Sequence, residues 1–258
     1  MQAKRRQLIL EMLEEKGEVL VKNLAEKLNV TMMTIYRDLK HFENEGIVSL
    51  TRNGAIYRGV QLDSDLPIFL RSIHNKYEKK ALAMKTVEFV QNQDTIFLDG
   101  STTTLEFAKI LTKTIFFNLT IITTSPLIIT ELIKNKNFNI ICYGGLLEKV
   151  NYFFIDADLA YHLKDININK SFLSARGFSI EHGITVASKD EAKEKKIVIE
   201  KSIESYFLLD HSKFNIISTY KVSDFNNNYI VTDNKYDSDS LSKLKKLGDR
   251  IIFVDVII

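Results

Sequence analysis

The chain has a single cysteine among its 258 residues, and this scarcity excludes two classes of protein. One thiol forms neither an internal disulfide nor a CxxC-type metal cage. We therefore expect a reducing, cytoplasmic environment. Cys142 lies in an apolar stretch, which predicts an inert thiol in the core.

Long hydrophobic runs are missing as well. No apolar stretch approaches the roughly 18 residues that a membrane-spanning helix needs. Charged residues interrupt the first apolar residues, so we expect no secretion signal. The hydrophobic share of 45% and the charged share of 26% are ordinary for a folded protein and argue against wholesale disorder. The length predicts one or two domains.

Motifs of the common enzyme classes are absent from the sequence. It contains no GxxxxGK[ST], GxGxxG, GxSxG or HExxH pattern. Its five histidines, at positions 41, 74, 162, 182 and 211, do not have the spacing of metal ligands. We therefore expect no metal and no cofactor.

The net charge is only +2, but all of the excess lies near the N-terminus. Residues 1–58 contain ten Lys and Arg and eight Asp and Glu, whereas the remainder is balanced. Two charges are a weak signal that acquires meaning only if a nucleic-acid-binding motif lies in the same segment.

The first 58 residues have the pattern of three helices followed by a ribbon. Apolar residues at helical spacing predict helices over 2–16 and 21–28, and a third from its N-cap Thr31 to Gly46. Asn53-Gly54 between two β-prone runs predicts a hairpin. This succession is a winged helix-turn-helix, in which the second helix of the motif enters the DNA major groove.

The third helix is expected to bury Ile35, Leu39 and Phe42, which are spaced at i, i+4 and i+7. The opposite face and the wing would then supply the donors that phosphates and base edges require. The alternative is a small helical bundle whose charges face only solvent. The predicted DNA contacts are Thr31, Met33, Thr34, Tyr36, Arg37, Lys40, Arg52 and Arg58.

The rest of the chain alternates between strands and helices. Residues 59–66 are polar and predict a linker, and a helix over 67–91 is expected to begin at Pro67. The apolar runs that follow suit strands covered on both faces, so the fold class is α/β with a mostly parallel sheet. The expected strands are 95–99, 119–123, 138–142, 171–174, 205–210, 229–233 and 250–256, and the expected helices are 103–112, 126–135, 155–162, 189–203 and 238–247.

The predicted domains are a DNA-binding domain over 1–58, a linker with the start of a connecting helix over 59–74, and an effector-sensing domain over 75–258. In open α/β sheets, ligands bind outside the carboxyl ends of the strands. The segment Asp99-Gly100-Ser101-Thr102-Thr103-Thr104 follows the first strand and opens a helix, where backbone N–H groups and hydroxyls favour an anion. It predicts a phosphate cradle, and the alternative is a helix cap without a ligand.

Three cations lie at other informative positions. Arg176 and Lys213 follow later strands, although each by itself is as typical of a solvated surface. Lys195, together with Lys196, flanks the centre of the inward stripe that Ala192, Ile199 and Ile203 define. It either extends past the core to water or reaches an anion, and the pattern slightly favours extension to water.

The N-terminal motifs resemble those of the DeoR family of bacterial sugar-operon regulators. The resemblance rests on the run NLAEKLNVTMMTIYRDLKHFENEG and on the wing tip RNGA. Tyr36 stands where the family has the first of two paired arginines, and Asn53 replaces a wing glycine. The first departure removes a phosphate-pairing charge and affects the choice of operator.

The C-terminal segment is similar to the DeoR sensor domain, which resembles ribose-5-phosphate isomerase and CoA-transferase folds. The matching runs include IFLDGSTTTLEFAKIL, SKDEAKEKK and LLDHSKF, with Ser101 where the family commonly has Gly. The resemblance implies a phosphorylated sugar as effector. It also implies that Asp99 accepts bonds from sugar hydroxyls, and that the phosphate is held by the loop and Lys213. The implied effector contacts are Asp99, Gly100, Ser101, Thr102, Thr103, Thr104, Arg176, Lys195 and Lys213.

An isomerase is the alternative function, with Asp99 or Glu181-His182 as the base. The winged helix-turn-helix argues against it, because a metabolic isomerase has no use for DNA. We expect a transcriptional regulator that represses a sugar-uptake or sugar-use operon, is not an enzyme, binds operator DNA, responds to a sugar phosphate, and forms a homodimer or larger homo-oligomer.

Overall fold

The computed structural model describes residues 2–57, 68–72 and 74–256. The chain divides into two units, Met1–His74 and Asn75–Ile258.

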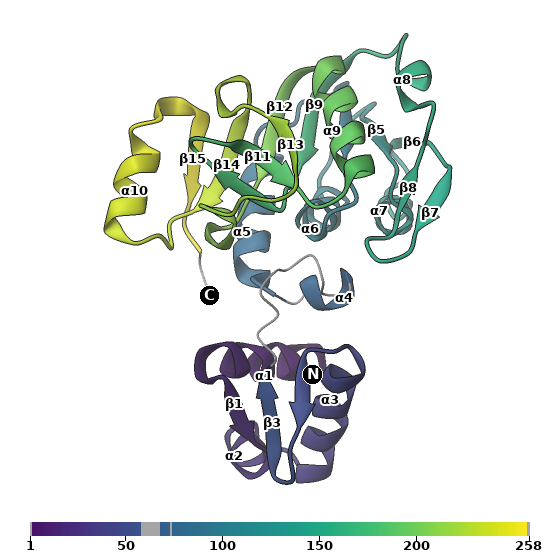
Figure 1. Cartoon of the computed structure of the whole chain (residues 1–258). Helices are drawn as coiled ribbons and strands as arrows, with labels where there is room; N and C mark the ends of the chain where they lie inside the picture. Colours follow the sequence, from purple (N-terminus) through teal and green to yellow (C-terminus); the bar gives the residue numbers. More distant parts are fainter. Residues whose placement is uncertain (1, 58–67, 73, 257–258) are drawn as a thin grey trace. The chain divides into compact units, whose positions relative to one another are not determined.

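The N-terminal unit is a winged helix-turn-helix, with the predicted three helices and hairpin (Figure 1). One strand was not predicted: β1 pairs antiparallel with β3, so the sheet has the order β1-β3-β2. The Cβ of any residue replacing Gly54 would lie 1.9 Å from the carbonyl oxygen of Val19, so this close pairing requires a glycine there. The elements are α1 (Gln2–Lys16), β1 (Glu18–Leu20), α2 (Val21–Lys27), α3 (Met32–Asn44), β2 (Val48–Leu50), β3 (Gly54–Tyr57) and α4 (Ile68–Arg71).

A seven-stranded parallel sheet forms the centre of the C-terminal unit, which confirms the predicted fold class. β4 and β9 are neighbours, and the chain builds the sheet outward from them in opposite directions. Their carboxyl ends therefore form a topological switch point, where open α/β sheets bind ligands. In spatial order the strands are β15 (Ile251–Val254), β14 (Tyr229–Asp233), β12 (Ser202–Leu208), β9 (Ile168–Leu173), β4 (Thr95–Leu98), β5 (Thr120–Thr123) and β6 (Asn139–Cys142).

Helices cover both faces of this sheet (Figure 1). Ile96 and Leu98 of β4 are fully buried in the cluster that includes α5, α6 and α7, whereas Phe97 is buried in the opposite cluster with α9 and α10. The continuous apolar character of the strands follows from this double covering. The helices are α5 (Lys76–Val87), α6 (Thr102–Leu111), α7 (Pro126–Leu132), α8 (Leu159–His162), α9 (Lys189–Lys201) and α10 (Ser238–Lys245).

Five short strands outside the central sheet were not predicted. β10, β11 and β13 form an antiparallel sheet, and β7 pairs with β8. The expected helix over 155–162 is therefore wrong in its first half, because Ile155 ends β8 and only the last four residues are helical. The strands are β7 (Leu146–Glu148), β8 (Phe153–Ile155), β10 (Gly177–Ser179), β11 (Gly183–Val186) and β13 (Tyr220–Ser223).

Three further expectations need correction. The helix over 67–91 is two helices, α4 and α5, and α5 begins after Asn75, whose φ of 47° lies outside the helical region. Pro67 lies outside the described residues. The helix over 189–203 ends at Lys201, because β12 begins at the next residue. Cys142 is exposed rather than in the core, since among the described residues β6 is the edge strand of the sheet and has a neighbouring strand on one side only.

Candidate functional site

Helix α3 presents the face that the sequence assigns to DNA. Thr31 caps the helix by accepting a hydrogen bond from the backbone N–H of Thr34, and the two threonine hydroxyls bond each other at 2.9 Å. Ile35, Leu39 and Phe42 are fully buried, as predicted. The opposite face is exposed at Met32, Met33, Tyr36, Arg37 and Lys40.

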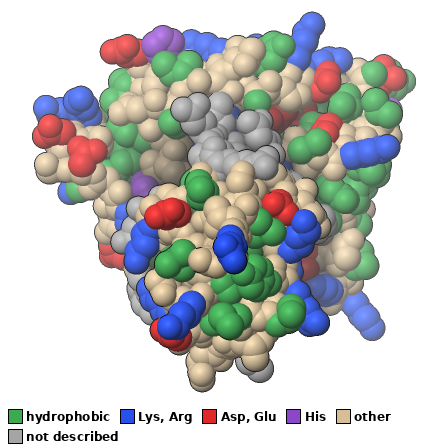
Figure 2. Space-filling view, turned by 60° about the horizontal axis from the view of Figure 1, so that its bottom comes forward, with side chains coloured by type: hydrophobic (Ala, Val, Ile, Leu, Met, Phe, Trp, Pro, Cys, Tyr) green, Lys and Arg blue, Asp and Glu red, His purple; other side chains and the backbone are tan. Residues whose placement is uncertain are grey.

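Hydrophobic side chains gather on the face of the N-terminal unit that comes forward in Figure 2, and Lys and Arg side chains lie around them together with Asp and Glu side chains. Lys40 pairs with Glu43 at 2.6 Å, but it remains mostly exposed. An exposed ion pair of this kind contributes little, so the lysine can exchange Glu43 for a phosphate.

Tyr36 connects α3 to the wing. Its hydroxyl donates a hydrogen bond of 3.1 Å to the backbone carbonyl of Arg52. The hydroxyl of Tyr36 thus has a partner within the unit and fixes the wing tip beside α3. Arg52 itself is exposed. The predicted contact Arg58 lies outside the described residues.

Asp38 is a positioning residue that sequence reasoning did not identify. Its carboxylate is 1% exposed and accepts bonds from Arg5 at 2.6 Å and Arg6 at 2.8 Å. The pairs fasten α1 to α3 and fix the orientation of α3. An acidic residue beside the buried Leu39, together with two adjacent arginines on α1, was the available signal.

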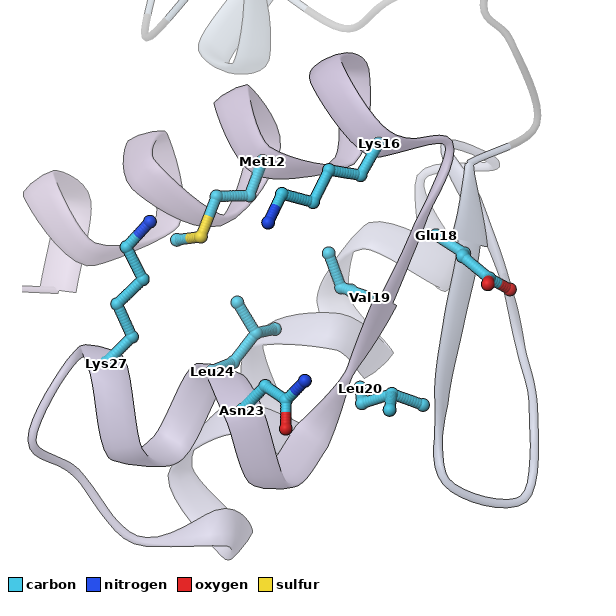
Figure 3. Close-up of a pocket in the computed structure, with 8 residues that line it drawn as sticks. All are labelled: Met12, Lys16, Glu18, Val19, Leu20, Asn23, Leu24 and Lys27. Carbon is cyan, nitrogen blue, oxygen red and sulfur yellow. The ribbon is translucent and has the colours of Figure 1, made fainter.

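The N-terminal unit also contains a hollow of about 300 Å³ between α1, β1 and α2. Met12, Val19 and Leu24 point toward it, and Lys16 and Lys27 lie at its rim (Figure 3). Of the predicted DNA contacts that the structure describes, none lines this hollow.

In the C-terminal unit, Asp99 lies at the switch point between β4 and β9. One carboxylate oxygen accepts bonds from the backbone N–H of Ser101 and the hydroxyl of Thr104, at 3.1 and 2.8 Å. The other accepts the backbone N–H of Ser174 at 2.7 Å and pairs with the ammonium of Lys195. Asp99 therefore joins the ends of both central strands to α9.

The charge of this buried pair is balanced locally. Burial by itself raises the pKa of Asp99, but the Lys195 ammonium and the hydrogen bonds outweigh it and hold that pKa below its ordinary value. Burial lowers the pKa of Lys195, but Asp99 and Glu191 more than reverse this and raise it. The expectation that Lys195 extends to water is wrong: the side chain is 2% exposed and reaches an anion, which is Asp99.

The hydroxyl-rich segment forms the first turn of α6, as predicted. Ser101 caps the helix by accepting the N–H of Thr104 at 3.2 Å. The side chains of Thr102, Thr103 and Thr104 are buried, so most hydroxyl groups of the segment face inward. Gly100 is half-buried and leaves no room for a Cβ, which would lie 2.9 Å from the Cβ of Phe153 in β8.

The other two predicted cations lie at the ends of neighbouring strands. Arg176 is half-buried between β9 and β10, and its backbone N–H donates to the carbonyl of Thr185 at 3.0 Å. Lys213 is buried in the short 3-10 turn His211–Lys213, which follows β12. In the same loop, Asp210 accepts the side-chain N–H of Asn75 at 2.9 Å.

Glu194 is a second buried carboxyl group that the sequence did not reveal. It accepts a hydrogen bond of 3.0 Å from the hydroxyl of Thr124, which follows β5. Burial raises the pKa of Glu194 to about 8 despite the attraction of Lys195. The side chain also lines a cavity of about 110 Å³ with residues that include Phe153, Asp156 and Lys193.

The alternative catalytic pair Glu181-His182 lies in the turn between β10 and β11, where His182 bonds Ser179. In the part of the chain that the structure describes, no three His, Cys, Asp or Glu residues are grouped to hold a metal ion. No helix there is both long and apolar enough to cross a membrane.

Two family models match the sequence. A DeoR-like helix-turn-helix domain matches residues 5–59, and a DeoR C-terminal sensor domain matches residues 74–234. Over 212 residues the chain is 34% identical to an uncharacterized HTH-type transcriptional regulator of Bacillus subtilis, YulB, covering 82% of this chain and 81% of that protein. It is 30% identical to the transcriptional repressor AccR of Agrobacterium fabrum, covering 80% and 79%.

Among solved structures, ribose 5-phosphate isomerase from Plasmodium falciparum aligns with a TM-score of 0.40 and 16% identity, over 54% of this chain and 53% of that one.

Proposed function

Because the chain belongs to the DeoR family of DNA-binding transcriptional regulators, we propose that it represses an operon for the uptake or use of a sugar, and that a phosphorylated sugar bound to its C-terminal unit controls the repression. The relatives are named as regulators, so the chain is not an enzyme. The observation that carries the proposal is the loop after β4, which Asp99 holds at the switch point of the sheet.

Asp99 has a different task in this proposal from the one that the family resemblance implies. A carboxylate offers about four acceptor positions. Four donors of the chain already use them, namely Ser101, Thr104, Ser174 and Lys195. Asp99 therefore holds the loop and α9 in place, and its direct contact with sugar hydroxyls stays a prediction.

In this proposal the phosphate binds at the N-terminal end of α6. The first N–H groups of a helix have no partner within the helix, and the helix dipole favours an anion there. Gly100, Ser101 and the buried Thr102 and Thr103 supply this end, while Lys213 and Arg176 supply positive charge from the neighbouring strand ends. Charge-assisted bonds to phosphate are strong enough to provide much of the affinity.

The loop of Lys213 offers a route from the effector to the DNA-binding unit. Asn75, directly before α5, donates hydrogen bonds to Asp210 and Ser212 of this loop. A ligand that draws Lys213 toward a phosphate would shift the residues that bond Asn75, and the chain runs from Asn75 into the N-terminal unit. A coupling of about 1–3 kcal/mol changes operator affinity about 5–150-fold.

On the DNA side, α3 enters the major groove and the wing contacts the backbone. The proposed contacts are Thr31, Met33, Thr34, Tyr36, Arg37, Lys40 and Arg52. Since helix-turn-helix proteins commonly bind paired half-sites, we propose a homodimer or larger homo-oligomer, which sedimentation of the purified chain measures.

The test is binding of the full-length protein to its own upstream DNA at fixed salt, with and without a panel of sugar phosphates. We expect one compound to change the affinity at least fivefold. The Lys213→Met variant should bind the same DNA but lose this response. Lys221→Met is the matched control, because this exposed lysine of β13 pairs with the nearby Asp224 in the turn that follows.

The outcomes separate the parts of the proposal. DNA binding that no sugar phosphate changes would contradict the effector. A normal response of Lys213→Met would remove that lysine from the site. Turnover of a sugar phosphate without DNA binding would contradict the regulator and favour the isomerase.

A further inference from the structure

The first turn of α3 exposes two large apolar side chains. Met32 is 55% exposed and Met33 is 62% exposed, although the unit has a complete core without them. Met33 lies on the face that also carries Arg37 and Lys40, which follow it by four and seven residues on the helix, and Met32 lies at the border of this face, four residues before Tyr36. An apolar surface flanked by cations is complementary to a partner that is anionic overall and has isolated apolar groups.

DNA offers one such group in its major groove. Of the four bases, only thymine carries a methyl group there, at C5, and apolar side chains recognise it by direct contact. The N-terminal residues of a recognition helix are those that contact base edges. Methionine suits this contact because its unbranched side chain adapts to the position of the methyl group.

The polar side chains of the same turn have partners within the chain. The hydroxyls of Thr31 and Thr34 bond each other, and the hydroxyl of Tyr36 bonds the wing. These residues stay among the proposed DNA contacts, but each hydroxyl already has a partner in the chain, whereas the two methionines face outward with no polar group to satisfy.

We propose that Met33, together with Met32, reads thymine methyl groups, so that each operator half-site has thymine opposite the first turn of α3. This inference rests on the proposed role of α3 as the recognition helix. The inference goes beyond that role by naming what α3 recognises in the operator: the apolar methyl group of thymine rather than a pattern of hydrogen-bonding groups.

The experiment begins with selection of duplexes from a random pool by the full-length protein. In the selected duplex, each thymine is then replaced in turn by deoxyuridine, which removes only the C5 methyl group. Loss of one buried methyl corresponds to about fourfold weaker binding. We expect one or two thymines in each half-site to show this loss with the wild-type protein.

The variants assign the loss to particular side chains. In Met33→Ala and Met32→Ala, the difference between thymine and deoxyuridine should disappear at the position that each residue reads. Met84→Ala is the matched control, because Met84 of α5 is 57% exposed and lies in the other unit. It should keep the full difference.

Each contrary result overturns the proposal in a recognisable way. Equal binding of thymine and deoxyuridine duplexes by the wild-type protein shows that no methyl is read. A difference that persists in both methionine variants assigns it to other residues. Altered sedimentation of Met33→Ala with an unchanged base preference places the methionines between copies of the chain. Failure to enrich any duplex contradicts the recognition helix itself.

Discussion

Lys195 of α9 forms an ion pair with Asp99, and each side chain is at most 2% exposed. The pair joins α9 to the loop that follows β4, so the geometry of the proposed effector site depends on it. Removal of one partner leaves a buried charge without compensation, which costs about 3–5 kcal/mol.

We therefore expect Lys195→Met to lower the free energy of unfolding by about 3–5 kcal/mol, measured by urea denaturation with circular dichroism. Lys196→Met is the control. The side chain of Lys196 is exposed, so this substitution should change the free energy of unfolding by less than about 0.5 kcal/mol. Adding Asp99→Asn to Lys195→Met should recover part of the loss. A loss below about 1 kcal/mol for Lys195→Met alone would contradict the pair as an organising interaction.

Features that depend on the spacing of apolar residues can be predicted from the sequence. Features that depend on a contact with a residue far away in the chain cannot. The buried stripe of Ile35, Leu39 and Phe42 follows from helical spacing alone. The same spacing placed Lys195 on an inward face, but it contains no information about the carboxylate that Lys195 meets. That carboxylate is 96 residues away in the chain.

Strands were missed for a related reason. β1 has three residues and pairs with β3, which follows two further helices and a strand in the chain, so its short segment has too little pattern to be detected. The apolar run around Cys142 is typical of a strand covered on both faces, so the sequence predicts a core position for this thiol. Only the strand order shows that β6 is at an edge.

Cys142 provides a direct test of that edge position. The thiol is exposed, but partial burial raises its pKa. We expect a thiol reagent such as DTNB to modify the native protein without denaturant, slowly near neutral pH and faster as the pH rises, because the thiolate is the reactive form. Cys142→Ser should not react and should remain as stable within about 0.5 kcal/mol. Modification that requires denaturant would contradict the exposed edge.

On the DNA-binding unit, Arg37 and Tyr36 should have separable effects. Arg37 is exposed, so Arg37→Ala should leave the unit folded and weaken DNA binding. It should also reduce the slope of log affinity against log salt by about 0.9 for each phosphate that the arginine neutralises. Lys243→Ala, on the exposed side of α10, removes the same charge and should leave the slope unchanged.

Tyr36→Phe removes a hydrogen bond but no charge. It should weaken DNA binding because the wing loses its bond to α3, while the salt slope stays that of the wild-type protein. Fluorescence anisotropy at several salt concentrations measures both quantities. A reduced slope for Tyr36→Phe, or an unchanged slope for Arg37→Ala, would contradict the assigned roles.

Glu194 should make stability depend on pH in an unusual direction. Burial raises its pKa from 4.5 to about 8, so between these values the folded state binds more protons than the unfolded state. The free energy of unfolding should therefore fall as the pH rises from 4.5 to about 8, by up to about 1.4 kcal/mol per pH unit, and become level above that window.

Glu194→Gln keeps an acceptor for the hydroxyl of Thr124 but does not titrate. The part of the fall in the free energy of unfolding that Glu194 causes should therefore be absent in this variant. His211 acts in the same direction, because its bond to Asp233 raises its pKa and the stability it provides is lost as the pH rises through that value. The free energy of unfolding is therefore measured by urea denaturation for the wild-type and Glu194→Gln proteins at several pH values from about 5 to about 8. Because both proteins contain His211, its contribution cancels in the difference between them. The variant should gain stability relative to the wild type at each step, whereas parallel profiles would contradict a neutral, buried Glu194.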